Sequence, residues 1–104
     1  MSKKAIRRSF RKAVLERDGY RCAKCGTPGE DRQEGGNLDA HHITNRNEMP
    51  NGGYVKENGV SLCDDCHIKA ESAEPEVEFR PENLYELIGS SHKAACAASE
   101  ALGR

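Results

Sequence analysis

Two Cys-x-x-Cys pairs constrain the fold of this chain more than any other feature of its sequence. Cys22 and Cys25 form the first pair, and Cys63 and Cys66 form the second. Zinc binds four thiolates in tetrahedral geometry, and two such pairs brought together by the fold supply that ligand set. Unconnected buried thiols or a redox pair are the alternatives, but neither explains the shared spacing or the glycine, Gly26, directly after the first pair. We therefore expect one closed, structural zinc site.

The size and composition of the chain agree with a fold that depends on a metal. The chain has 104 residues, 36% of them hydrophobic, with three Tyr, two Phe and no Trp. Such a core is thin, and small domains with thin cores often need a metal or a covalent cross-link. The length predicts a single domain, residues 1–104. The fifth cysteine, Cys96, lies in an alanine-rich helical pattern and is expected to be a small buried residue.

The sequence favours a cytoplasmic protein with no membrane partner. No apolar run approaches the length of a membrane span, and the N-terminal residues are too basic and too poor in apolar residues to form a signal peptide. In the cytoplasm, paired cysteines bind metal more often than they form disulfides, and an odd number of cysteines fits reduced thiols.

Charge is distributed unevenly along the chain. Residues 1–24 contain nine Lys or Arg and two acidic residues, a net charge of +7; because the whole chain carries −1, the remainder carries −8. The overall charge argues against a protein that merely coats nucleic acid. The asymmetry favours one face that meets a polyanion, although a solvated helix face is the alternative.

Periodicity and turn residues predict the secondary structure. Apolar residues at helical spacing, with basic residues opposite them, predict an amphipathic helix over residues 5–17 that stops at Asp18-Gly19. A knuckle turn at 20–26 and a polar loop at 27–36 follow. Alternation predicts a strand at 38–43, paired across a long loop with a second strand near 59–62. Short helices are expected at 64–72, 83–88 and 91–102.

The middle of the chain places histidines and cysteines in a specific order. Cys22-x-x-Cys25 is followed by Asp39-Ala-His41-His42-Ile43, by Gly52-Gly53, and by Asn58-Gly-Val-Ser-Leu-Cys63-x-x-Cys66-His67. This order resembles the HNH nucleases, also called ββα-metal nucleases, in the subgroup with two zinc knuckles. The resemblance covers about residues 10–72, and residues 76–104 lie outside it as a helical C-terminal extension.

The resemblance implies a small α+β domain, stapled by zinc, with a ββα-metal core in which a two-stranded hairpin precedes a helix. It also implies that His42 is the general base, that His41 and His67 bind a divalent cation, and that Asn58 holds the loop of His42 in place. The pKa of histidine suits a base that acts near neutral pH. The cation would be Mg2+ or Mn2+, with Ni2+, Co2+ or Zn2+ as substitutes at an imidazole-rich site.

Two positions depart from the pattern of many relatives. Those relatives have Asp where this chain has His41, and some have His or Asn where this chain has Glu71. A carboxylate at 71 would bind the cation as a third ligand or orient His67; alternatively, Glu71 is an exposed helix residue with no such role. Alternation along the strand separates His41 from His42 without showing which one faces the substrate.

We therefore expect a divalent-metal-dependent DNA endonuclease or nicking enzyme. Compact relatives act in bacteriophage packaging or in restriction. The alternatives are a non-catalytic zinc module that binds nucleic acid, and a structural adaptor whose histidines are incidental. The C-terminal helices would cover the core or contact a partner protein. The candidate DNA contacts, which give affinity without sequence preference, are Arg7, Arg8, Arg11, Lys12, Arg17 and Arg21 in the basic segment and Arg46 beside the histidines.

Overall fold

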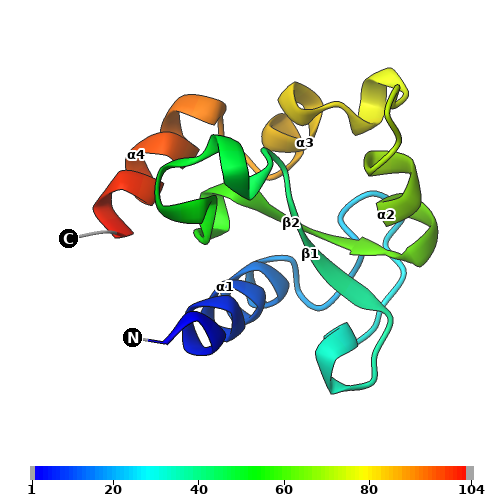
Figure 1. The fold of residues 1–104 in the computed structure, drawn as a ribbon. Helices are drawn as coiled ribbons and strands as arrows, with labels where there is room; N and C mark the ends of the chain where they lie inside the picture. Colours follow the sequence, from blue (N-terminus) through cyan, green and yellow to red (C-terminus); the bar gives the residue numbers. More distant parts are fainter. Residues whose placement is uncertain (1, 103–104) are drawn as a thin grey trace.

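A computed structural model describes residues 2–102, so Met1, Gly103 and Arg104 of the predicted domain lie outside the described residues. Strands β1 (Leu38–His42) and β2 (Gly59–Cys63) pair antiparallel, with Leu38 opposite Cys63 and His42 opposite Gly59. Helix α2 (Asp64–Ala70) follows β2 without a break. The predicted α+β fold with a ββα core is confirmed. In Figure 1 the two strands cross the middle of the molecule and the helices surround them.

The two faces of the hairpin contact different helices. Helix α1 (Lys3–Arg17) covers one face so closely that a Cβ atom on Gly59 would lie 2.5 Å from a methyl carbon of Val14. On this face the His42 ring stacks on Phe10 with 4.5 Å between ring centroids. On the other face, His41 lies against His67 of α2, with 5.1 Å between ring centroids. The alternation of the strand therefore separates the two adjacent histidines.

The end of α1 is fixed to the start of β2 by a pair of charged residues. The Arg17 guanidinium donates to the carbonyl oxygens of Lys56 and Gly59, and it forms an ion pair of 2.8 Å with Asp18. The Asp18 carboxylate also accepts a hydrogen bond of 2.9 Å from the backbone N–H of Ser61. Gly19 then ends the helix with φ at 68°. The predicted helix is confirmed, and it begins two residues earlier than expected, where Ser2 caps it.

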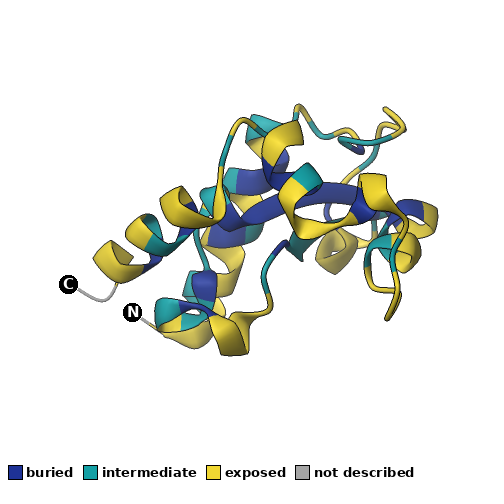
Figure 2. Ribbon diagram, turned by 90° about the horizontal axis from the view of Figure 1, so that it is seen from above, coloured by how far each residue is buried: buried dark blue, intermediate teal, exposed yellow. Residues whose placement is uncertain are grey.

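The C-terminal part of the chain packs on the loop between the two strands. Helix α3 spans Pro81–Leu87 and α4 spans His92–Leu102, close to the predicted ranges. Leu84, Tyr85 and Ala95 are buried in the core, and Cys96 packs against that core but is only partly buried. In Figure 2 strand β2 is buried along its length, β1 is of intermediate burial after Leu38, and the outer surfaces of the helices are exposed.

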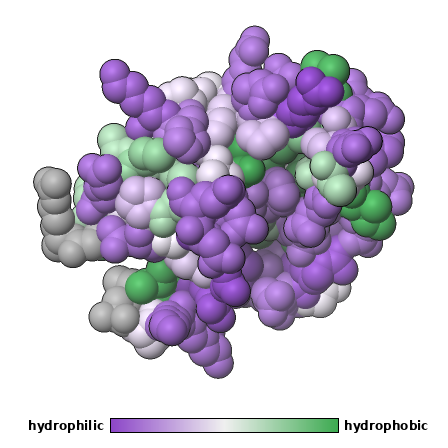
Figure 3. All heavy atoms as spheres, turned by 45° about the horizontal axis from the view of Figure 1, so that its top comes forward, coloured by the Kyte–Doolittle hydropathy of each residue, from purple (hydrophilic) through white to green (hydrophobic). Residues whose placement is uncertain are grey.

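The surface of the molecule is mainly hydrophilic. Figure 3 shows polar and charged side chains over most of one face, with hydrophobic residues in separate patches. Among the large hydrophobic side chains, Ile68, Val77, Leu87 and Leu102 are exposed. None of the helices in residues 2–102 combines the length and the hydropathy needed to span a bilayer.

Candidate functional site

The four cysteines of the two pairs converge at the junction of β2 and α2. Cys22 and Cys25 lie on a tight turn that Gly26 closes, with φ at 80° and its N–H donating to the Cys22 carbonyl at 2.8 Å. The N–H of Ala23 donates to the carbonyl of Ser61 at 2.8 Å, which holds this turn against β2. Cys63 ends β2, and Cys66 lies in the first turn of α2.

The geometry of the cysteine cluster fits one tetrahedral zinc ion. All four sulfur atoms lie within 4.8 Å of one another, and those of Cys25 and Cys63 are 3.6 Å apart. Tetrahedral ligands with Zn–S bonds of about 2.3 Å lie about 3.8 Å apart. Burial raises the pKa of the Cys63 and Cys66 thiols, whereas a hydrogen bond with the Thr27 hydroxyl lowers the pKa of Cys25 to about 6. A coordinated thiol is deprotonated, so zinc would relieve the conflict between burial and ionisation.

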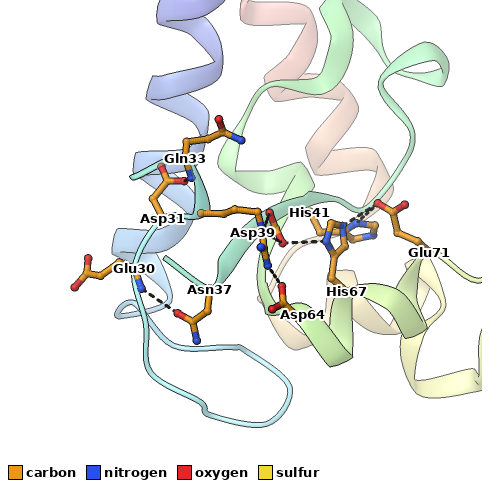
Figure 4. A network of polar contacts seen from close by, with 10 residues as sticks. Glu30, Asp31, Gln33, Asn37, Asp39, His41, Asp64, His67 and Glu71 are labelled. Carbon is orange, nitrogen blue, oxygen red and sulfur yellow. Dashed lines mark hydrogen bonds and ion pairs between the residues drawn. The ribbon is translucent and has the colours of Figure 1, made fainter. Parts of the chain in front are cut away.

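A second cluster lies on the α2 face of the hairpin. It consists of His41 from β1, His67 from α2 and Glu71 at the end of α2, with their ligand atoms all within 4.8 Å of one another. Glu71 Oε1 lies 2.8 Å from His67 Nε2 and 3.7 Å from His41 Nδ1. Figure 4 shows the three side chains directed toward one another. Cis ligands around an octahedral ion with bonds near 2.1 Å lie about 3 Å apart, so the cluster can hold a divalent cation.

Burial favours the neutral form of the His41 imidazole, which can bind a metal ion. Burial, and after it the nearby His67, lower the pKa of His41 to about 4, although the charge of Glu71 acts in the opposite direction. The imidazole is therefore neutral at pH 7, which is the form that binds metal. The donor set of two ring nitrogens and one carboxylate suits Mn2+, Ni2+, Co2+ or Zn2+ better than Mg2+, which prefers oxygen ligands.

Asp39 contacts His67, a role that the sequence pattern did not predict. Its Oδ2 atom lies 3.2 Å from His67 Nδ1, and its carboxylate forms an ion pair of 2.9 Å with Arg32, which also pairs with Asp64. The ring nitrogens of His67 thus face two carboxylates, Asp39 at Nδ1 and Glu71 at Nε2, and donation from Nδ1 to Asp39 would leave Nε2 to share a cation with Glu71. The available signal was alternation, which places Asp39 on the same side of β1 as His41.

His42 lies at the wall of the same cleft but packs toward α1. An open cleft of about 550 Å3 is lined by His41, His42, Arg46, His67 and Glu71, among others. The His42 ring lies between Phe10 and Tyr54, with 4.8 Å from its centroid to that of Tyr54. Burial and the nearby Arg46 lower the pKa of His42, which favours the neutral form that accepts a proton.

Asn58 holds the loop that follows His42. Its side chain is fully buried, and its Oδ1 atom accepts a hydrogen bond of 3.0 Å from the N–H of Thr44. Its Nδ2 atom donates to the carbonyls of Thr44 and Gly53 at 3.1 and 3.3 Å. The hydroxyl of Tyr85, a residue of α3, donates to Oδ1 at 2.7 Å. The sequence offered no local signal for this last contact.

The basic residues divide into those that stabilise the fold and those that are free. Arg17 makes the contacts to β2 described above, Arg11 pairs with Asp31 at 2.9 Å, and Lys12 lies 3.9 Å from Glu16. Arg21 donates to the carbonyl of Gly26. Within residues 2–102, four exposed cations of α1 and two of the loop between the strands have no carboxylate within 4 Å: Lys3, Lys4, Arg7, Arg8, Arg46 and Lys56.

Comparisons with known proteins agree with the resemblance seen in the sequence. A family model described as HNH endonuclease matches residues 22–73, which include both cysteine pairs, His41, His42, Asn58, His67 and Glu71. Neither the curated proteins nor the solved structures gave a match to the chain.

We expect one tightly bound zinc ion per chain. Cys66→Ser should remove it and lower the thermal stability sharply, because the three remaining thiols cannot complete the tetrahedron and the binding energy of structural zinc is folding energy. Cys96→Ser, which changes the cysteine outside the cluster, is the matched control and should keep the ion. Native mass spectrometry gives the metal content, and retention of zinc in Cys66→Ser would contradict the assignment.

Proposed function

This chain belongs to the HNH endonuclease family, and from that premise we propose that it is a divalent-metal-dependent DNA endonuclease or nicking enzyme. The observation that carries the proposal is the convergence of His41, His67 and Glu71 on one cleft whose wall is formed by His42. A module that only binds nucleic acid needs neither a cluster of metal-binding groups nor a neutral imidazole beside it.

His42 is the proposed general base. One of its ring nitrogens accepts a proton from a water molecule as the water oxygen forms a bond with the phosphorus. The bond from phosphorus to the 3′ oxygen breaks, and that oxygen takes up a proton, leaving a 5′ phosphate and a 3′ hydroxyl. His42 Nε2 is buried and has no hydrogen-bond partner among residues 2–102. The proposal therefore includes a turn of this ring toward the cleft when DNA binds.

His41, His67 and Glu71 are the proposed ligands of the catalytic cation, which is Mg2+ or Mn2+, with Mn2+ favoured by the donor set. When bound, the cation neutralises charge on the scissile phosphate and on the leaving oxygen. Asp39 keeps His67 Nε2 available through the hydrogen bond at Nδ1. Cys22, Cys25, Cys63 and Cys66 hold a separate structural zinc ion that takes no part in the reaction.

The proposed DNA surface lies between α1 and the loop after β1. Lys3, Arg7, Arg46 and Tyr54 line a cavity of about 340 Å3 there, and Arg46 also lines the cleft with the histidines. Hydrogen bonding by Arg46, and the proximity of Arg7, lower the pKa of Tyr54, as expected where positive charge concentrates. Phosphates on either side of the cleaved bond would contact these cations. Arg8 and Arg21 stay candidate DNA contacts outside this cavity, while Arg11, Lys12 and Arg17 already have acidic partners.

Plasmid nicking tests the activity. The wild-type protein with Mn2+ or Mg2+ should convert supercoiled plasmid to open-circular or linear DNA, and His42→Ala should lower the rate by about 10²–10⁴-fold because the water loses its base. DNA affinity should be unchanged in this variant.

His92→Ala is the matched control for the nicking assay, because His92 is exposed and lies on α4. Equal rates in wild type and His42→Ala would refute the assignment of the base. Retained DNA binding with no nicking in Mg2+, Mn2+, Ni2+ or Co2+ would instead support the non-catalytic zinc module.

Metal titration tests the ligand set without an activity assay. Followed by electron paramagnetic resonance, Mn2+ should bind His67→Ala and Glu71→Gln at least about tenfold more weakly than the wild type, because each change removes a ligand atom. His92→Ala and Glu74→Gln are the controls and should bind normally. If Glu71→Gln binds Mn2+ with the wild-type affinity, Glu71 is an exposed helix residue and not a ligand of the cation.

The salt dependence of binding tests the DNA surface. With His42→Ala protein and a duplex oligonucleotide, Arg7→Ala and Arg46→Ala should each weaken binding and reduce the slope of log K against log salt by about one. Arg80→Ala, which removes an exposed arginine from the acidic part of the chain, should change neither. If the slopes for Arg7→Ala and Arg46→Ala equal that of the parent protein, DNA binds to another part of the surface.

A further inference from the structure

We propose that Tyr85 of the C-terminal extension is a positioning residue of the nuclease site, acting on the His42 loop through Asn58 and Thr44. The inference rests on the proposed function for its catalytic consequence. Tyr85 lies outside residues 22–73, the part of the chain that matches the family. The extension is therefore a component of the active site of this particular chain.

The side chain of Asn58 uses all of its hydrogen-bonding capacity. An amide oxygen accepts two hydrogen bonds and an amide nitrogen donates two. Oδ1 accepts from the N–H of Thr44 and from the Tyr85 hydroxyl, and Nδ2 donates to the carbonyls of Thr44 and Gly53. Without the Tyr85 hydroxyl, this buried amide would lose one of its four partners, and Oδ1 would keep only the N–H of Thr44 as a donor.

The Tyr85 hydroxyl has a defined direction. Its single proton goes to Asn58 Oδ1 at 2.7 Å, so the Thr44 hydroxyl, also at 2.7 Å, donates to the Tyr85 oxygen. Tyr85 is 3% exposed, and burial raises its pKa, so the phenol keeps the proton it donates. The N–H of Thr44, which can only donate, fixes the orientation of the Asn58 amide with Oδ1 toward it, and the Tyr85 hydroxyl therefore meets an acceptor.

The network reaches the backbone next to the proposed base. Thr44 follows His42 by two residues, and both its N–H and its carbonyl bond to the Asn58 side chain. Between them, the N–H of Ile43 donates to the Asn58 carbonyl at 2.9 Å. A displacement of about 1 Å in a catalytic group can cost about 10²-fold in rate, so a small change in this loop is sufficient to affect catalysis.

Two other contacts bind the same loop to the extension. Asn51 Nδ2 donates to the carbonyl of Ser99 in α4 at 2.9 Å, and the hydroxyl of Ser90 donates to the carbonyl of Glu57 at 2.9 Å. With Tyr85, the extension thus holds the loop near its beginning, its middle and its end. In Figure 1, α4 lies beside this loop and away from α2.

Tyr85→Phe tests the role because it deletes one oxygen and keeps the buried ring. We expect kcat for plasmid nicking to fall about tenfold, with the Kd for DNA and the affinity for Mn2+ within twofold of wild type. Thr44→Val removes the other hydroxyl of the pair and should lower kcat too, and the double variant should lose less than the product of the two effects because both break one network. Tyr20→Phe is the control, since the Tyr20 hydroxyl has no hydrogen bond within residues 2–102.

Amide hydrogen exchange provides a readout that does not depend on activity. In Tyr85→Phe, the Thr44 N–H should exchange about tenfold faster, because its acceptor is no longer held, while amides in β2 and α1 keep their rates. If the wild-type protein does not nick DNA, the proposed function fails, and this measurement still decides whether Tyr85 orders the loop. Unchanged exchange at Thr44, or a loss of kcat matched by an equal loss of DNA affinity, would overturn the proposal. If Tyr85→Phe does not fold, kcat for nicking and amide exchange at position 44 would be measured in Thr44→Val instead.

Discussion

The cysteine cluster at the end of β2 joins elements that the thin core alone would hold weakly. Cys22 and Cys25 come from the turn after α1, while Cys63 and Cys66 come from the strand and the helix of the ββα core. Burial opposes ionisation of the thiols of Cys63 and Cys66, so metal coordination and folding are coupled at this point. The orientation of α2, and with it the position of His67, depends on this junction.

Helix and strand geometry then separate two functions that are adjacent in the sequence. Cys66 and His67 are neighbours on α2, yet a helix turns about 100° per residue, so their side chains serve different clusters. His41 and His42 are neighbours on β1, and the period of two directs them to opposite faces of the hairpin. Both histidines nevertheless line one cleft, in which His41 belongs to the cluster with His67 and Glu71 and His42 forms part of the wall.

Local sequence patterns predicted the helices, the strands and the cysteine cluster. They did not predict which side chains from distant elements contact one another. The hairpin, α2 and the cysteine cluster were predicted because spacing, alternation and turn residues are local signals. The contact of Asp39 with His67 was not, because nothing in the strand shows which residue of a distant helix will face it. Arg17 illustrates the same limit: the basic N-terminal segment made it a candidate DNA contact, whereas its guanidinium donates to the carbonyl oxygens of Lys56 and Gly59. The roles of His42 and Asn58 rest on the resemblance to the family, and that of Glu71, where the chain departs from the family, rests on its position beside His67; all three stay predictions.

The contacts of Tyr85 and Ser99 have a consequence for the order in which the molecule is assembled. Tyr85 follows Asn58 by 27 residues, and Ser99 follows Asn51 by 48, whereas Cys66, the last zinc ligand, precedes both helices. A chain emerging from the ribosome can therefore close its metal cluster while the loop after His42 still lacks its restraints. On the proposed function, the loop beside His42 would reach its final geometry, and the protein its full rate, only after α3 and α4 have docked.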